Sequence, residues 1–332
     1  MGYNKPQNYL HHSNPVSIKL NLPSPIQSIE HPLLQQQRIK VWVKRDDLIH
    51  PIISGNKWRK LTANIENCIA LGQNQVVSFG GAYSNHIHAL AFAGKQFGIK
   101  TTGIIRGESR YASNYTLRWA EHWGMQLRFV NRNTYRLRED PVFLSDLQRQ
   151  FPLARIIPEG GSNKLALRGV GQLIDELDKQ LSFDYLLCPV GSGGTLAGLI
   201  QGSDNRHQIL GISVLKQQDY LHAQVEHLLD NPQRYRNWQI LNQYHCGGYG
   251  KFQPSHLQKM CDLQQQLSLP IEPVYSGKML LAFWEMMQQH QFAPGSRIVL
   301  LHTGGLQGLG GMLERGLISP DDWQLPPSAP EN

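Results

Sequence analysis

Hydrophobic residues follow two alternating periods along most of the chain. Short apolar runs rich in β-branched residues, such as 76–79 and 184–190, predict strands. Between such runs, apolar residues recur at helical spacing, as in 56–70, and predict amphipathic helices. The predicted strands are 39–44, 76–79, 101–106, 125–130, 155–158, 184–190, 209–215 and 297–303, and the predicted helices are 56–70, 86–97, 113–123, 141–150, 164–180, one after 195 and one ending near 313.

This alternation predicts an α/β fold of parallel sheets covered by helices. The run 184–190 is continuously apolar, as expected of a strand that is buried on both faces. The chain has 332 residues, more than one typical domain, so we expect two packed lobes.

Four polar loops stand out as places for a ligand, because open parallel sheets bind ligands at the carboxyl ends of their strands. Three of the four are rich in glycine, which permits close backbone approach. The loops are 54–60, 80–86, 191–195 and 302–305.

The loop 191–195, Gly-Ser-Gly-Gly-Thr, has the composition of a phosphate cup. Small residues let successive backbone N–H groups face one anion, and the following helix adds its positive end. A plain tight turn is the alternative. The loop lacks the lysine of a P-loop, and no Gly-x-Gly-x-x-Gly follows a strand with an acidic residue at the right distance, which argues against a dehydrogenase.

Lys57 lies at the start of the helix predicted over 56–70. The helix dipole disfavours a cation there, so such a lysine is a candidate for a neutral amine or an imine. Lys60 follows one turn later and can reach the same cleft. For both residues the alternative is an ordinary solvent-facing lysine.

Further candidates lie in the other polar loops. Ser84 and Asn85 begin a helix, where capping alone would explain one of them. Tyr249 and Tyr275 lie beside glycines, which suits a phenol facing a cleft, although buried packing is the alternative. Thr303 is either a site residue or a helix cap.

Composition and charge remove several classes of function. The hydrophobic fraction is 40% and the charged fraction 17%, typical of a folded domain. The net charge is +7, but the basic residues are scattered, and the densest stretch, 132–138, is interpreted as a solvated face, so no nucleic acid is expected. His86 and His88 are not spaced to share one metal ion, so no metal site is predicted.

Cysteine usage and apolar runs predict a cytoplasmic protein. The four cysteines form no Cys-x-x-Cys pair, which favours a reducing compartment. No apolar run reaches the ~20 residues of a membrane helix, and residues 1–15 lack the apolar core of a signal peptide.

Taken in order, seven motifs resemble the 1-aminocyclopropane-1-carboxylate (ACC) deaminase/D-cysteine desulfhydrase family. These are pyridoxal-phosphate (PLP) enzymes of fold type II, with the tryptophan-synthase-β-like architecture. The resemblance extends from about Pro25 to Leu313. The motifs are KRDDL (44–48), SGNKWRKL (54–61), GGAYSNH (80–86), PEGGSN (158–163), GSGGTLAG (191–198), VYSGK (274–278) and HTGG (302–305).

The resemblance implies a homodimer whose subunit has a large PLP-binding domain, 1–58 with 157–332, and a small domain, 59–156. It implies that Lys57 holds pyridoxal 5'-phosphate as a Schiff base and that Ser84 lies near the reacting carbon and carboxylate. Asn85 would bind the ring hydroxyl, Thr303 would face the ring nitrogen, and Tyr249 and Tyr275 would face a small amino-acid substrate. The phosphate would be held by Lys60 and the backbone of Gly191, Ser192, Gly193, Gly194 and Thr195.

Two positions of the resemblance favour D-cysteine desulfhydrase over ACC deaminase. Ser276 and Thr303 stand where ACC deaminases carry Glu and Leu. Without a carboxylate at the ring nitrogen, carbanion storage is weaker, which suits β-elimination of a good leaving group such as sulfide. Tyr83 departs from the Gln common in the family, so a reshaped pocket and a non-catalytic phosphate-ligand-binding protein stay open as alternatives.

Overall fold

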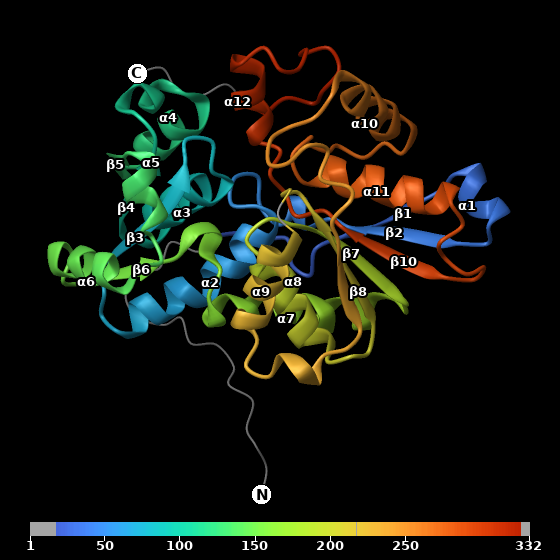
Figure 1. Ribbon diagram of the computed structural model, residues 1–332, viewed down its shortest axis with the longest axis horizontal. Coiled ribbons are helices and arrows are strands. Elements are labelled where there is room, and N and C mark those ends of the chain that lie inside the picture. Colours follow the sequence, from blue (N-terminus) through green and yellow to red (C-terminus); the bar gives the residue numbers. More distant parts are fainter. Residues whose placement is uncertain (1–17, 217, 327–332) are drawn as a thin grey trace, which may run out of the picture.

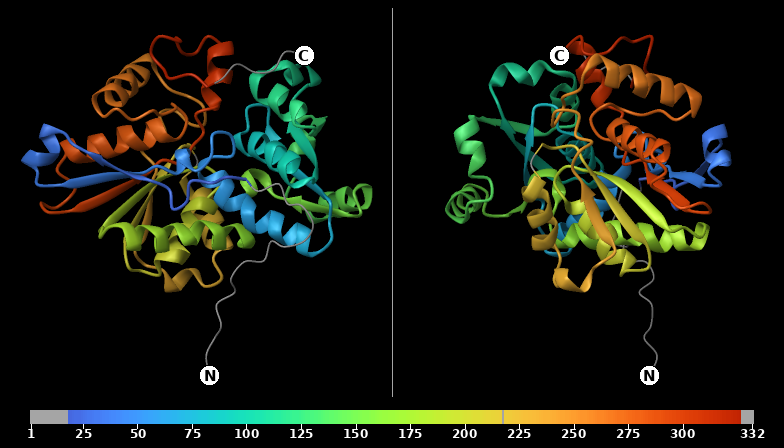
Figure 2. Two further views of the ribbon diagram at one scale, coloured as in Figure 1. Left: turned by 180° about the vertical axis from the view of Figure 1, so that it is seen from behind. Right: turned by 45° about the vertical axis from the view of Figure 1, so that its right-hand side comes forward.

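The computed structural model describes residues 18–216 and 218–326. Their strands form two sheets that lie side by side (Figures 1 and 2). The larger sheet has the order β1 (Ile26–Ile29), β2 (Lys40–Lys44), β10 (Arg297–Leu301), β7 (Tyr185–Val190), β8 (Gln208–Ser213) and β9 (Trp238–Leu241). The smaller sheet has the order β5 (Gln126–Val130), β4 (Lys100–Arg106), β3 (Gln75–Gly81) and β6 (Ala154–Ile157).

Helices cover both faces of the larger sheet (Figure 1). Apolar side chains alternate along its strands, so that Leu187 and Leu300 face one core while Leu186 and Leu301 face the other. The first core also takes residues from α10 (Pro254–Gln266), α11 (Ser276–Gln288) and α12 (Gly308–Glu314), and the second from α7 (Lys164–Gln180), α8 (Gly194–Ser203) and α9 (Gln218–Leu228). The short α1 (Pro32–Gln36) packs beside β2.

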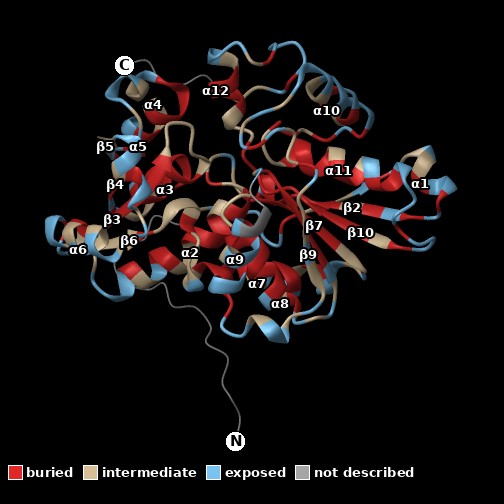
Figure 3. Cartoon of the chain, in the orientation of Figure 1, coloured by how far each residue is buried: buried red, intermediate tan, exposed pale blue. Residues whose placement is uncertain are grey.

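The smaller sheet is covered in the same way. One face packs against α3 (Asn85–Phe97) and α4 (Tyr115–His122), and the other against α5 (Arg132–Arg136) and α6 (Pro141–Gln150). Helix α2 (Gly55–Ala70) contacts α3 of this unit and α7 of the other. Buried residues recur along α2, α7 and the strands (Figure 3), and α2 joins the two units.

The periodicity of the sequence predicted most of these elements. All eight predicted strands are present, and α6 and α7 have the predicted bounds. The sequence prediction did not include β1, β9 or α1, α5 and α9 to α11. The sheets are parallel as predicted except at one edge, where β1 pairs antiparallel with β2. The domain boundaries remain a prediction, and the expectation for residues 1–15 lies outside the described residues.

Two other expectations concern the cysteines and membrane-spanning helices. All four cysteines are free, and three of them are buried. Among the described residues, no helix is long and apolar enough to span a bilayer.

The motif KRDDL builds a buried network of charges rather than a site for a ligand. Arg59 of α2 donates to both oxygens of Asp46 at 2.6 and 2.8 Å, and to both oxygens of Glu176 on α7 at 2.9 and 3.0 Å. Lys44 lies 3.2 Å from Glu176. Two cations and two anions therefore neutralise one another where β2, α2 and α7 meet, and this fixes the direction in which α2 leaves the sheet.

We predict that Asp46→Asn lowers the free energy of unfolding by about 3 kcal/mol, because two buried cations then share the single carboxylate of Glu176. Urea unfolding of the cofactor-free protein measures the change. Asp146→Asn is the control, because Asp146 pairs with Arg149 on the exposed face of α6 and its loss is expected to cost under about 1 kcal/mol. Equal costs for the two variants would contradict a special role of the network.

Candidate active site

The first turn of α2 is pressed against the loop that follows β10. Gly55 has a φ of +63°, and a Cβ at this position would lie 1.9 Å from the carbonyl oxygen of Thr303. The N–H of Asn56 donates to the same oxygen at 3.3 Å. Only glycine allows this approach, so two of the four loops that the sequence singled out, 54–60 and 302–305, are in contact.

Asn56 connects Lys57 to the glycine-rich loop. Its Oδ1 accepts a hydrogen bond from Lys57 Nζ at 2.7 Å, and its Nδ2 donates to Thr195 Oγ1 at 2.8 Å. Asn56 and Thr195 are both buried, and Lys57 is half-buried. One amide group therefore holds the Lys57 amine facing the first turn of α8.

Lys60, one turn after Lys57, lies inside a cup built by two loops. Its Nζ donates to Ser162 Oγ at 2.9 Å and to the Gly160 carbonyl oxygen at 3.2 Å, and lies 3.4 Å from Ser192 Oγ. The two hydroxyls are 2.7 Å apart. The loop 158–163 was recognised as a motif, but the prediction assigned no role to Ser162 or Gly160.

The cup has no room for a further side chain at Gly194. A Cβ on Gly194 would lie 2.5 Å from Ser162 Oγ and 3.1 Å from Lys60 Nζ. Lys60 is 2% exposed, and among the described residues it forms no ion pair with a carboxylate. The N-terminal N–H groups of α8 begin at this point, so the predicted residues 191–195 and Lys60 do lie together.

Burial shifts the acidity of both lysines. It lowers the pKa of Lys57 to about 8, and the charge of Glu272 opposes this shift. Burial and the charge of Lys57 hold the pKa of Lys60 well below its usual value. About a tenth of Lys57 is therefore a neutral, nucleophilic amine at pH 7, far more than for an ordinary lysine.

The other wall of the site comes from the smaller sheet. Ser84 is the N-cap of α3, and its Oγ accepts from the Ile87 N–H at 3.3 Å, so the capping interpretation holds for this residue. Asn85 begins α3 and points at the loop after β10, since a Cβ on Gly305 would lie 2.9 Å from its Nδ2. The amide of Asn85 thus faces the same loop that Gly55 touches.

Tyr275 and Tyr249 lie together beside the Lys57 amine. The ring centroid of Tyr275 is 6.0 Å from Lys57 Nζ, and its hydroxyl donates to that of Tyr249 at 3.4 Å. A Cβ on Gly191 would lie 3.2 Å from the Tyr275 ring. Burial raises the pKa of both phenols, so both stay protonated at neutral pH.

A buried carboxylate, Glu272, was missed by the sequence analysis. It accepts hydrogen bonds from the N–H groups of Val274, Tyr275 and Ser276 at 2.7–2.9 Å and from Ser276 Oγ at 3.0 Å. Burial nevertheless raises its pKa to about 7. A signal was present in the sequence: Glu272 stands three residues before Tyr275, at the start of α11, where carboxylates are favoured.

Three further residues lie in or just after the loop 80–86: Tyr83, His86 and His88. His86 and His88 are buried, and among the described residues no group of three or more ligating side chains could hold a metal ion. Tyr83 packs on α12: a Cβ on Gly311 would lie 2.6 Å from its ring, and Arg315 lies 5.3 Å from the ring centroid. The Tyr83 ring therefore contacts α12 of the larger unit.

Comparison with known proteins identifies the family. A model of pyridoxal-phosphate dependent enzymes matches residues 21–304. The chain belongs to this family. It is 29% identical over 306 residues to a putative ACC deaminase of Thermotoga maritima, covering 86% of this chain and 95% of that one. It is 27% identical over 312 residues to the bifunctional D-cysteine desulfhydrase/ACC deaminase of Arabidopsis thaliana, covering 87% and 78%.

The fold is also that of a solved family member. A crystal structure of an ACC deaminase homologue aligns with a TM-score of 0.78 at 24% identity and covers 92% of this chain and 96% of that one. The tryptophan-synthase-β-like fold predicted from the motifs is therefore confirmed.

The residues of the site fit pyridoxal phosphate. The cofactor of this family needs an amine for its aldehyde carbon and donors for a phosphate. Lys57 supplies the amine, while Lys60, Ser162, Ser192 and the start of α8 supply the donors. The role of each residue remains a prediction.

We predict that the cofactor-free protein gains stability relative to a Lys57→Met variant as the pH rises from about 8 toward 10.5. The folded pKa of Lys57 is about 8 and the unfolded value is 10.5. Between these values the unfolded chain binds more protons, so a rise in pH favours the folded state. Urea unfolding at several pH values measures the difference. A constant difference across this window would contradict the lowered pKa.

Proposed function

We propose that this chain is a PLP-dependent lyase and deaminase whose substrate is D-cysteine, converted to pyruvate, sulfide and ammonia. The observation that carries the proposal is the placement of the Lys57 amine by Asn56, which also binds the first turn of α8. One small molecule can thereby reach both a nucleophilic amine and an anion cup.

When bound, pyridoxal phosphate supplies the electron sink that stabilises a carbanion at the α-carbon of an amino acid. The cup around Lys60 would hold the phosphate. Lys57 would hold the aldehyde carbon, and after release its neutral amine would take the α-proton. Ser84 and Asn85 at the N-terminus of α3 suit the substrate carboxylate and the ring hydroxyl.

The tyrosine pair would assist with the leaving group. Both phenols remain protonated at neutral pH because burial raises their pKa. The Tyr275 hydroxyl donates to that of Tyr249, so the Tyr249 proton is the one left for a further hydrogen bond. A protonated pair at this position is suited to donate a proton to a departing sulfur atom.

Two features support D-cysteine as the substrate. Ser276 and Thr303 both carry hydroxyl groups. By the family resemblance, ACC deaminases have Glu and Leu at these two positions. The Ser276 hydroxyl is fully buried and donates to Glu272, so residue 276 contributes no charge of its own. The Arabidopsis thaliana relative is named for this activity and for ACC deaminase, whereas the Thermotoga maritima relative is named as a putative ACC deaminase alone.

ACC deaminase is the second candidate, and the buried carboxylate of Glu272 favours it. Ring opening of a cyclopropane lacks a heteroatom leaving group and needs a stronger electron sink. A carboxylate near the site promotes protonation of a pyridine nitrogen and so strengthens the sink. The homodimer implied by the family resemblance and the cytoplasmic location predicted from the sequence remain part of the proposal.

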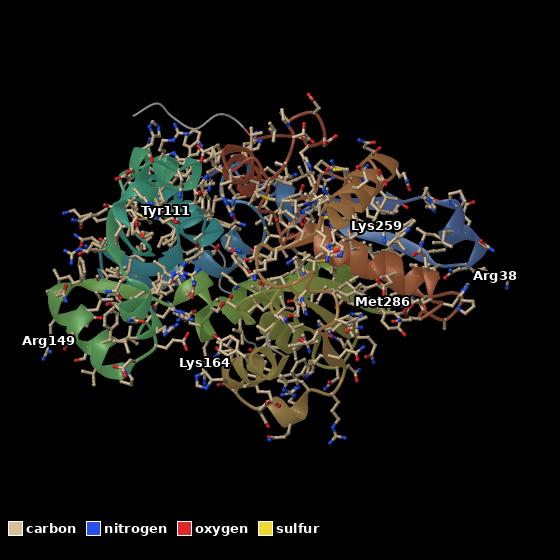
Figure 4. The ribbon with its side chains drawn as sticks, turned by 45° about the horizontal axis from the view of Figure 1, so that its top comes forward. Arg38, Tyr111, Arg149, Lys164, Lys259 and Met286 are labelled. Carbon is tan, nitrogen blue, oxygen red and sulfur yellow. The ribbon has the colours of Figure 1, made fainter. Side chains whose placement is uncertain are left out.

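We predict that the purified protein is yellow and that Lys57→Ala loses the colour on gel filtration, because no amine then holds the aldehyde carbon. Turnover should fall by about three orders of magnitude. Lys259→Ala, on the exposed surface of α10 (Figure 4), should keep both the colour and the activity. A colourless Lys57→Ala protein with full activity would end the proposal.

A substrate panel separates the two candidates. With PLP-loaded protein, we expect a kcat/KM for pyruvate formation from D-cysteine at least ~10-fold above the values for L-cysteine and D-serine. It should exceed the kcat/KM for 2-oxobutanoate formation from ACC by the same factor. Turnover of ACC alone would support the second candidate. Bound cofactor without turnover of any compound would support a binding protein instead.

A further inference from the structure

Two arginines flank the buried ring of Tyr135 near the site. The guanidinium carbon of Arg106 lies 5.5 Å from the ring centroid, and that of Arg138 lies 5.3 Å from it. Arg138 is neutralised, because its Nε lies 2.7 Å from a carboxylate oxygen of Glu159. Among the described residues, no carboxylate forms an ion pair with Arg106, whose side chain is exposed at the end of β4. Its charge is therefore available to a ligand.

Arg106 belongs to the wall of the site. It is the last residue of β4, and the register of the sheet pairs it with Gly81, three residues before Ser84. One of its terminal nitrogens would lie 3.5 Å from a Cβ on Gly81. The side chain thus lies over the start of the loop that carries Ser84 and Asn85.

The tyrosine pair connects Arg106 to the Lys57 side of the site. The charge of Arg106 lowers the pKa of Tyr249, against the larger rise caused by burial. Tyr249 is hydrogen-bonded to Tyr275, whose ring faces Lys57 Nζ. Lys57 therefore lies beside the ring of Tyr275, one member of the pair, and the charge of Arg106 acts on Tyr249, the other member.

The guanidinium has a fixed platform. Tyr135 is 3% exposed, so its ring is held in place, and the cation–π contact with it restricts the guanidinium of Arg106. An oriented guanidinium binds carboxylate or phosphate oxygens through two parallel hydrogen bonds. D-Cysteine has no second anion to place there.

We propose that Arg106 binds an anionic group on the side chain of the substrate, so that the site accepts α-amino acids carrying a second negative charge. This inference rests on the proposed function and names a substrate class for the same site. It extends the class beyond neutral cysteine to compounds with an acidic substituent at the β-carbon.

An O-phosphoserine illustrates the chemistry. The α-proton passes to a base of the site, and the Cβ–O bond breaks with its electron pair leaving on the phosphate oxygen. Addition of one water to the remaining enamine gives pyruvate and ammonia. The overall products are pyruvate, ammonia and inorganic phosphate, with no change of redox state.

Binding of aspartate and asparagine tests the charge preference directly, because the two differ little in size. Titration of PLP-loaded protein, followed by the absorption of the bound cofactor, should give at least ~10-fold tighter binding of one enantiomer of aspartate than of the matching asparagine. Arg106→Gln should abolish this ratio, and Arg106→Lys should retain part of it. O-phosphoserine and serine provide the same comparison for pyruvate formation.

Arg110→Gln is the matched control. Arg110 is exposed like Arg106 and also lies 5.5 Å from a tyrosine ring, that of Tyr111, but it pairs with Glu108. The ratio should be unchanged in this variant. Equal binding of aspartate and asparagine by the yellow wild-type protein, or an unchanged ratio in Arg106→Gln, would overturn the inference. Absence of bound cofactor would instead count against the proposed function.

Discussion

Two ammonium groups one turn apart, Lys57 and Lys60, define the chemistry of this protein. They stand in the first two turns of α2, where the helix dipole and burial both oppose positive charge. Each therefore has a lowered pKa. Such a pair is costly unless an anion joins it, and the cup of hydroxyl and backbone groups around Lys60 is shaped to receive one.

The surrounding fold keeps these groups in place. Gly55 lets α2 approach the loop after β10, while Arg59, two residues after Lys57, anchors the other side of the helix to Asp46 and Glu176. The helix that carries the reactive amine is thus fixed by a glycine on one side and by an ion network on the other. Lys57 can only swing by its own side-chain torsions, which is the pre-organisation that covalent catalysis requires.

The sequence predicted the parts that follow from local rules. Periodicity predicts α2 and the parallel strands, and the polar loops at strand ends identify Lys57, Lys60 and 191–195 as neighbours. It could not predict β1, because a four-residue edge strand carries little periodic signal. It also missed Asn56 and Ser162, because an Asn or Ser in a loop looks the same whether it caps a helix or bridges two distant segments.

Glu272 shows why the substrate is harder to predict than the cofactor. The sequence predicted the substrate partly from whether residue 276 carries a charge. In the structure, Ser276 carries none and donates a hydrogen bond to the carboxylate of Glu272. The electron demand of the site therefore depends on whether Glu272 is ionised, and burial raises its pKa to about 7. Binding of a cationic group nearby would favour the ionised form, whereas an anion would favour the protonated one. A substrate with a second negative charge would have that charge held by Arg106 rather than by the lysines. The opposite charges of Glu272 and Lys57 would then continue to offset each other.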